Sequence, residues 1–231
     1  MKFKRNESYR MHLLGGLIAV CAVALWSPAP VLAVPQTLQS GTELSGNQDY
    51  SGVGVKFHVN SSVDVTDLGI FDSGQNGITS GTTLSAFLMT SVGVTLASQT
   101  FDNASPGTLD GRYRFKSIPV TTLAPGDYVL AGYGWTPTDQ EHNCNIGGAC
   151  EVFNTGGGLL TYVSSPYGGG TDPAGTLPTN ECCGNLNFFA AANMKFDATP
   201  TNGAVPEPAT LLLLGSGLVG LAAWRRKKPA A

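Results

Sequence analysis

Apolar and polar side chains alternate over much of the chain with a period of two, which is typical of half-buried β-strands. In residues 53–59 apolar side chains occupy every second position, and residues 186–196 show the clearest repeat of this pattern. Further strands are predicted at residues 63–71, 84–89, 92–97, 112–118, 128–133 and 159–163. Residues 34–204 show no convincing apolar period of 3.6 residues, so we expect no amphipathic helix there.

Turn-forming residues separate these predicted strands at short intervals. Asn76-Gly77, Asp110-Gly111 and Pro125-Gly126 favour tight turns, because Gly adopts positive φ and Pro fixes φ near the value that such turns need. Many short strands joined by turns favour two packed antiparallel sheets. We therefore predict an all-β fold, an antiparallel β-sandwich over residues 34–204, a length that suits one domain with a sizeable core.

The N-terminus departs from this pattern. A leader with four basic residues up to Arg10 precedes 14 uncharged residues, Leu13 to Trp26, and then the sequence Val31-Leu32-Ala33. This order is typical of a secretory signal peptide, so we expect residues 1–33 to form a signal helix that is removed by cleavage after Ala33. A retained N-terminal anchor is the alternative. Both interpretations place residues 34–208 beyond the cytoplasm.

The C-terminus carries a second apolar segment. Ala209 to Trp224 is 16 residues without a charge, and as a helix it would extend roughly 24 Å, short of a hydrocarbon core about 30 Å thick. Four basic residues follow it, Arg225, Arg226, Lys227 and Lys228, and these resist transfer across the membrane. The prolines of Val205-Pro206-Glu207-Pro208 keep the preceding segment extended. We predict a short transmembrane helix with this exposed tetrapeptide at the membrane surface.

The order of Val205-Pro206-Glu207-Pro208, apolar helix and basic cluster closely resembles the PEP-CTERM sorting signal. That signal is found on exported proteins of Gram-negative bacteria that make exopolysaccharide. The resemblance implies that a membrane-embedded exosortase recognises Pro206-Glu207-Pro208, cuts the chain there and releases or transfers the mature protein to the cell exterior. It covers residues 205–231 and concerns sorting alone. An ordinary single-pass anchor that follows two prolines is the alternative.

A second, looser resemblance covers residues 50–196. The sequences of residues 54–57, 65–72 and 123–129 are similar to a β-sandwich module that recurs among PEP-CTERM proteins. Each matched sequence has a structural role, because it forms a strand or a turn that leads into a strand. The likeness therefore supports the fold and implies nothing about activity. The module usually lacks the cysteine-bearing insertion seen here.

The net charge of the segment between the two terminal segments limits the partners that we expect for the protein. Residues 34–208 contain five basic and 15 acidic residues, which gives this segment a net charge of −10. Contacts to nucleic acid need clustered Lys and Arg, so we expect no nucleic-acid partner. An acidic surface that keeps an exported protein soluble explains this charge best. It is also compatible with calcium or a hydrated polysaccharide, but we expect no metal residue and no cofactor.

The insertion at about residues 136–184 is rich in Gly, Pro, Asn and Thr, and residues 159–163 are its one expected strand. Four of the five cysteines lie there, Cys144, Cys150, Cys182 and Cys183. An even set of cysteines in an oxidising compartment indicates disulfides. We favour a local bridge between Cys144 and Cys150. Bridges from this pair to Cys182 or Cys183 are the competing arrangement, because a bond between the adjacent residues Cys182 and Cys183 would demand strained geometry. The spacing matches no common zinc site.

The same region contains residues that could serve in nucleophilic catalysis or in the binding of sugar rings. Asp139, Glu141, His142 and Cys144 lie close in sequence, and a Cys with a His can form an activated nucleophile, although a disulfide would consume the thiol. We propose no catalytic residue and expect no enzyme. Aromatic residues near the insertion could stack on sugar rings or pack in the core; they are Tyr133, Trp135, Tyr162 and Tyr167.

The sequence thus predicts an exported, non-catalytic structural or adhesive component of the cell surface or exopolysaccharide matrix. Its expected partners are the Sec export machinery, an exosortase, the inner membrane as a transient anchor, and exopolysaccharide. The precursor would be held in the inner membrane with its domain in the periplasm, and the mature form would be secreted or remain at the cell surface. A carbohydrate-binding module is the alternative, and a surface hydrolase is the third hypothesis.

Overall fold

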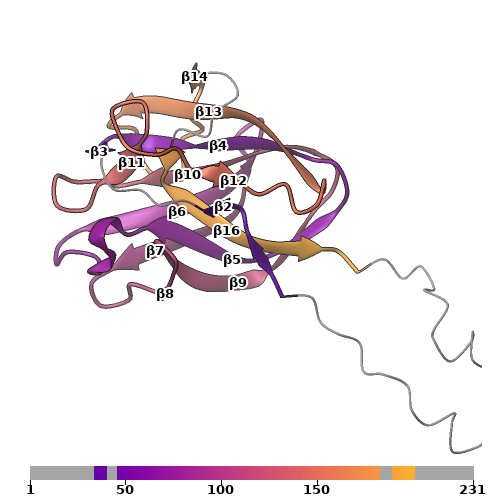
Figure 1. Ribbon diagram of the computed structural model, residues 1–231, viewed down its shortest axis with the longest axis horizontal. Helices are drawn as coiled ribbons and strands as arrows, with labels where there is room; N and C mark the ends of the chain where they lie inside the picture. The colour runs from indigo at the N-terminus through magenta and orange to yellow at the C-terminus, as the bar shows by residue number, and fades with distance from the viewer. Residues whose placement is uncertain (1–33, 41–45, 183–188, 201–231) are drawn as a thin grey trace, which may run out of the picture. The chain divides into compact units, whose positions relative to one another are not determined.

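The computed structural model describes residues 34–40, 46–182 and 189–200, and these form an all-β domain (Figure 1). All of them belong to one compact unit, residues 33–200. The predicted signal helix, transmembrane helix, sorting tetrapeptide and basic cluster lie outside the described residues. Among the described residues, no helix is long and apolar enough to cross a membrane.

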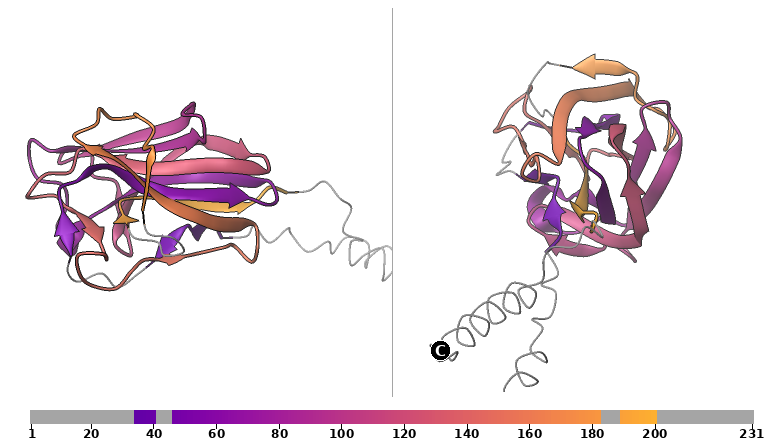
Figure 2. Two further views of the ribbon diagram at one scale, coloured as in Figure 1. Left: turned by 90° about the horizontal axis from the view of Figure 1, so that it is seen from above. Right: turned by 90° about the vertical axis from the view of Figure 1, so that its right-hand side faces the viewer.

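Two large sheets lie face to face (Figure 2) and confirm the predicted antiparallel β-sandwich. The five-stranded sheet has the order β1 (Gln36–Thr37), β16 (Ala192–Ala198), β5 (Val63–Phe71), β9 (Tyr113–Leu123), β8 (Thr108–Asp110). The six-stranded sheet has the order β14 (Asn180–Cys182), β13 (Leu160–Gly170), β4 (Ser51–Val59), β10 (Gly126–Tyr133), β6 (Thr83–Thr90), β7 (Thr95–Asp102). The pairings given for these strands are antiparallel.

Short strands form two smaller sheets beside the sandwich. One has the order β15 (Phe189–Ala190), β11 (Glu141–Asn143), β3 (Asn47–Gln48), and the other pairs β12 (Val152–Phe153) with β2 (Gln39–Ser40). A short 3-10 turn, η1 (Ser73–Gln75), follows β5. Segments far apart in sequence therefore meet in each small sheet.

The core lies between the two large sheets and follows the alternation seen in the sequence. Burial of each Val, Leu, Ile or Phe side chain stabilises the fold by roughly 1.5 to 3 kcal/mol. The inward side chains of the central strands are fully buried: Val53, Val55, Phe57 and Val59 on β4, and Val63, Val65, Leu68 and Ile70 on β5. The facing residues Met194 and Phe196 of β16 complete the same cluster.

The structure corrects two expectations about strand positions. The insertion was expected to hold one strand, but it contains β11, β12, β13 and β14. β11 was missed because its three residues are polar although all three are buried. The strand expected at residues 92–97 begins at Thr95 instead, because Gly93 has φ +88° and forms a turn between β6 and β7.

Part of the insertion covers the outer face of the six-stranded sheet. Met89, Val129, Ala131 and Tyr133 form a second small apolar cluster, and Leu177 of the insertion packs against it. The hydroxyl of Tyr133 donates a hydrogen bond to the carbonyl of Thr176. The loop between β13 and β14 thereby shields apolar side chains that an uncovered sheet would expose to water.

The chain enters and leaves the domain at the same end of the sandwich (Figure 1). Gln36 of β1 lies opposite Phe196 of β16, so the first and last described strands are neighbours. β15 directly precedes β16 and lies at the opposite end with β3 and β11. β16 has seven residues, so the two ends are roughly 20 Å apart.

The close approach of β4 and β10 generates a prediction about Gly54. A Cβ at this position would overlap the carbonyl oxygen of Leu130 and lie 2.7 Å from the Cα of Ala131, its partner in the ladder. We expect Gly54→Ala to lower the free energy of unfolding by about 3 kcal/mol, because backbone atoms of a central strand cannot move aside. Chemical unfolding of the oxidised protein measures this loss.

Gly157→Asn is the matched control for that substitution. Gly157 has φ +72°, which Asn tolerates, and no atom of the described residues lies within 4 Å of an added Cβ. We expect its free energy of unfolding to change by less than about 0.5 kcal/mol. Equal losses in the two variants would show that the β4–β10 contact is not the cause.

Candidate binding site in the insertion

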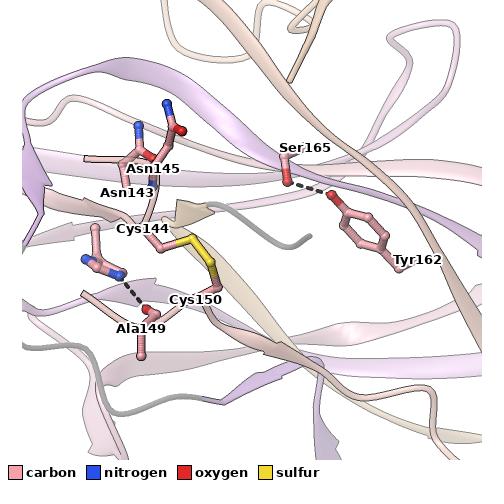
Figure 3. Close-up of a disulfide and its surroundings, with 8 residues drawn as sticks. Asn143, Cys144, Asn145, Ala149, Cys150, Tyr162 and Ser165 are labelled. Carbon is pink, nitrogen blue, oxygen red and sulfur yellow. Dashed lines mark hydrogen bonds between the residues drawn. A yellow bond between two sulfur atoms is a disulfide. The ribbon is translucent and has the colours of Figure 1, made fainter. Parts of the chain in front are cut away.

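A disulfide between Cys144 and Cys150 closes a short loop in the insertion (Figure 3). The two Cα atoms are 4.9 Å apart, and the bond is the local bridge that the sequence favours. The backbone N–H of Asn143 donates a hydrogen bond to the carbonyl of Gly46 at 2.9 Å, which holds the base of the loop against the chain before β3. Cys182 is also disulfide-bonded, and Cys183 lies outside the described residues.

The three residues of β11 carry polar side chains into the protein interior. Glu141 and His142 are fully buried, and Asn143 is nearly so. The Nε2 of His142 lies 2.8 Å from the carbonyl oxygen of Ala149, inside the disulfide loop, and its ring lies 6.5 Å from that of Phe71. Because Cys144 is oxidised, its sulfur is not a thiol that His142 could activate. The residues considered for a Cys–His nucleophile therefore build the loop.

Glu141 is the most unusual titratable group in the described part of the chain. Neither carboxylate oxygen has a hydrogen-bond partner of standard geometry among the described residues. Burial raises the pKa of Glu141 well above its ordinary value of 4.5, and the nearby side chain of Gln48 offsets part of this shift. The structure thus favours an uncharged carboxyl at the centre of the small β15-β11-β3 sheet.

A pocket of about 190 Å³ lies on the face of this small sheet that carries Glu141. Gln48 pairs with Glu141 and Phe189 pairs with Asn143, so these four side chains share one face. The described residues that line the pocket are Gln48, Tyr50, Asn143, Tyr167, Cys182 and Phe189. Asn143, Tyr167 and Cys182 belong to the insertion, and Gln48, Tyr50 and Phe189 lie outside it, so the pocket forms where the insertion meets the sandwich, and it is the candidate binding site.

Two tyrosines form one wall of this pocket. Their rings lie edge to face, with centroids 6.3 Å apart and an interplanar angle of 66°. The hydroxyl of Tyr50 donates a hydrogen bond to the carbonyl of Gly168 at 2.8 Å, which fixes its ring. The side-chain oxygen of Asn143 accepts a hydrogen bond from the N–H of Asn145 at 2.9 Å. The pocket therefore combines held aromatic rings with oriented amide groups.

The structure separates the four aromatic residues that the sequence singled out as sugar-stacking candidates. Tyr133 is 1% exposed and Trp135 is 6% exposed, so these two rings pack in the core, which is the second of the two alternatives that the sequence left open. Burial, and to a lesser extent the carboxylate of Asp172, raise the pKa of Tyr133. The hydroxyls of Tyr162 and Ser165 form a hydrogen bond (Figure 3), and the ring of Tyr162 packs against that of Phe153. Of these four aromatic residues, Tyr167 is the one that lines the pocket.

Sequence reasoning missed Tyr50, Gln48 and Phe189. Tyr50 precedes the first predicted strand and has no local pattern that distinguishes it. The ring of Tyr50 packs on Gly170, where an added Cβ would lie 2.8 Å from it. This contact between β13 and the residue before β4 depends on strand pairing over more than 100 positions, so no signal in the sequence could have revealed it.

A second cavity of about 240 Å³ lies where β1, β2, β8, β9 and β16 meet. It is lined by Thr37, Gln39, Ser40, Asp110, Gly111, Arg112, Tyr113 and Asn193. The side chain of Asn193 accepts from the N–H of Gln39 at 3.1 Å and donates to its carbonyl at 2.8 Å. Lys195 and Asp110 form an ion pair of 2.6 Å at the rim. These contacts hold the first strands on β16 and serve the fold.

Within residues 34–40, 46–182 and 189–200, no group of three or more His, Cys, Asp or Glu side chains is placed to hold a metal ion. Among the acidic side chains, the carboxylate of Asp72 accepts a hydrogen bond from Nε of Arg114 at 2.6 Å.

Comparison with known proteins identifies the C-terminal segment. Residues 204–227 match the family model described as the PEP-CTERM protein-sorting motif. The match contains Val205-Pro206-Glu207-Pro208, the whole apolar segment and most of the basic cluster. The motif indicates an exported protein that an exosortase processes and that has a C-terminal membrane anchor before cleavage. No curated protein matches the chain.

Two solved structures show a weak likeness. "Structure of infectious bursal disease virus Gt strain" is 14% identical with a TM-score of 0.17, over 83% of this chain. "D431N Mutant VP2 Protein of Infectious Bursal Disease Virus; Derived T=1 Particles" is 13% identical with a TM-score of 0.18, over 83% of this chain. The chain spans 55% and 51% of the respective viral chains. TM-scores this low support no argument about this protein.

The disulfide loop leads to a stability prediction. We expect the double variant Cys144→Ser/Cys150→Ser to unfold with a free energy about 2 kcal/mol lower than that of the natural protein, because the bridge restricts the unfolded chain. The double variant leaves no odd thiol and keeps the bond of Cys182, so thermal unfolding without reductant isolates this bridge. An unchanged unfolding free energy would contradict the prediction.

Glu141 leads to a pH-dependent prediction. The folded protein keeps this carboxyl protonated at pH values where the unfolded chain has lost the proton, so stability falls as the pH rises above 4.5. Glu141→Gln stays neutral at every pH. We expect the variant to be more stable than the natural protein at pH 7, by about 1 to 3 kcal/mol, and the difference to vanish toward pH 4. Unfolding curves measured across this range test it.

Glu181→Gln is the control for the pH experiment. Glu181 is exposed and lies 3.3 Å from Nζ of Lys56, so its substitution removes the same formal charge without changing a buried group. We expect it to bring no gain in stability at pH 7. Parallel pH curves for the natural protein and Glu141→Gln would refute the assignment of a neutral buried carboxyl.

Proposed function

We propose that this chain, whose residues 204–227 carry a PEP-CTERM protein-sorting motif, is a non-catalytic structural or adhesive component of the cell surface or exopolysaccharide matrix. The motif is the single observation that carries the proposal. It indicates delivery to the cell exterior by an exosortase, and such delivery suits a protein that works in the extracellular matrix. The role of the domain itself is inferred from its fold, its charge and its disulfide.

The proposed route follows the order of segments along the chain. The signal peptide, residues 1–33, directs export through the Sec machinery and is removed after Ala33. The apolar segment Ala209 to Trp224 then retains the chain in the inner membrane, and Arg225 to Lys228 stop it from crossing completely. The exosortase acts at Pro206-Glu207-Pro208 and frees the domain from its anchor.

Features of the domain support a role outside the cytoplasm. The Cys144–Cys150 bridge suits an oxidising compartment, where disulfides persist. The net charge of −10 over residues 34–208 suits a hydrated extracellular matrix and favours solubility at neutral pH. Because the described chain enters and leaves at one end of the sandwich, the opposite end remains available for contacts in the matrix.

Support for a non-catalytic role comes from the insertion. The one cysteine that lies beside a histidine in sequence is consumed by a disulfide, and His142 is buried with its Nε2 directed at a backbone carbonyl. Glu141, a carboxyl of the insertion whose pKa is raised by burial, lies at the centre of a small sheet. These groups contribute to the architecture of the loop in place of a reactive centre.

Intact mass of the protein tests the proposed route. In cells with an active exosortase, we expect protein from the culture medium or envelope to lack residues 1–33 and the segment after the Pro-Glu-Pro motif. The variant Glu207→Ala should keep Arg225 to Lys228 and remain in the membrane fraction. Thr201→Ala, outside the motif, is the control and should be processed normally. Mature protein that retains the basic cluster in such cells would refute the proposal.

A further inference from the structure

We propose that the tyrosine pocket of the insertion binds a single neutral sugar ring, a pyranose presented by a polysaccharide chain. This inference deepens the proposed function and rests on it, because it names the chemistry by which an adhesive protein would hold a matrix polymer. The site consists of Tyr50 and Tyr167 with the amide side chains of Gln48 and Asn143.

The size of the pocket favours one ring. At about 190 Å³ it is smaller than the range of roughly 300 to 1,000 Å³ that is typical of sites for larger organic ligands. An extended apolar segment or a multi-ring cofactor would exceed this space. One six-membered ring with its hydroxyl groups is a ligand of suitable volume.

The character of the lining side chains favours a ligand with one apolar face and polar edges. Tyr50 and Tyr167, which are half-buried, supply aromatic surface on which the C–H face of a pyranose can stack. Gln48 and Asn143 supply amides, each with donors and an acceptor that match hydroxyl groups. A sugar ring is the common biological ligand that presents both kinds of surface together.

The absence of charge at the pocket argues against ionic ligands. None of the described residues that line it has an ionised side chain. Glu141 lies on the same face of the small sheet, but it is fully buried and does not line the pocket, and burial raises its pKa and so favours the neutral carboxyl. Phosphate, carboxylate or ammonium groups would find no counter-ion there and would lose their hydration. A neutral hydroxylated ligand meets no such penalty.

The pocket is built from fixed parts, which reduces the entropy lost on binding. The ring of Tyr50 is held by its hydrogen bond to Gly168, and Asn143 is anchored by the N–H of Asn145 and by the neighbouring disulfide loop. Tyr167 lies on β13, which pairs directly with the central strand β4. β3 and β11, which carry Gln48 and Asn143, lie at the end of the sandwich opposite to the chain exit (Figure 1), so the chain termini do not obstruct a polymer there.

Binding of simple glycosides to the exported, oxidised protein tests the proposal. The probes are methyl glycosides of glucose, galactose, mannose and N-acetylglucosamine, measured by saturation-transfer NMR and by tyrosine fluorescence. We expect at least one to bind with a Kd of about 1 mM, as suits a single ring. Tyr167→Ala should weaken that binding roughly tenfold, whereas Tyr167→Phe, which keeps the ring, should bind within about twofold of the natural protein.

Tyr128→Ala is the matched control, since Tyr128 is a half-buried tyrosine near the opposite end of the sandwich. It should bind the glycosides as the natural protein does. Thermal unfolding checks each variant, and if Tyr167→Ala does not fold, Gln48→Ala takes its place and should weaken binding several-fold. Equal binding by Tyr167→Ala, or by Gln48→Ala where it replaces it, and by the natural protein would overturn the site.

Failure of this proposal and failure of the proposed function are distinguishable. Intact mass is recorded on the same sample before binding is measured. If the mass shows correct processing but none of the four glycosides binds, the sugar site is refuted and the sorting route stands. If the mass shows an unprocessed C-terminus, the sorting route is refuted whatever the glycosides do.

Discussion

The apolar interface between the two large sheets is the constraint on which the rest of the structure depends. Alternate side chains of β4 and β5 are fully buried there, and β16 fills the same cluster from the facing edge. Because side chains alternate along a strand, this burial fixes which face of every strand points inward. It therefore also fixes where the strands end and which of their last residues project from the ends of the sandwich.

The candidate site is formed where strands of the sandwich end. β3, β11 and β15 are too short to form a stable sheet alone, and they are held because each continues a segment that the sandwich already anchors. Burial of Glu141 and His142 costs stability that the apolar core and the disulfide offset.

The local alternation of apolar and polar residues was sufficient to predict the sandwich, but it was not sufficient to predict the pocket. The period of two in residues 53–59 predicted β4, because one face of that strand meets water or small residues while the other meets the core. β11 could not be predicted, since its polar residues are buried by pairing with β3 and β15, which are distant in sequence. Likewise the sequence could not decide whether Tyr133 and Trp135 stack on a ligand or pack in the protein, and the fold buries both of them.

The pairing of β1 with β16 bears on how the domain would carry mechanical load. Residues 34 and 200 lie at one end and the tyrosine pocket at the other, so tension between a bound polymer and the chain exit runs parallel to the strands. Ladder hydrogen bonds are perpendicular to that direction. They would be sheared together along β16 and its neighbours β1 and β5, instead of being peeled apart one after another. Such geometry spreads force across the ladder and suits a tether.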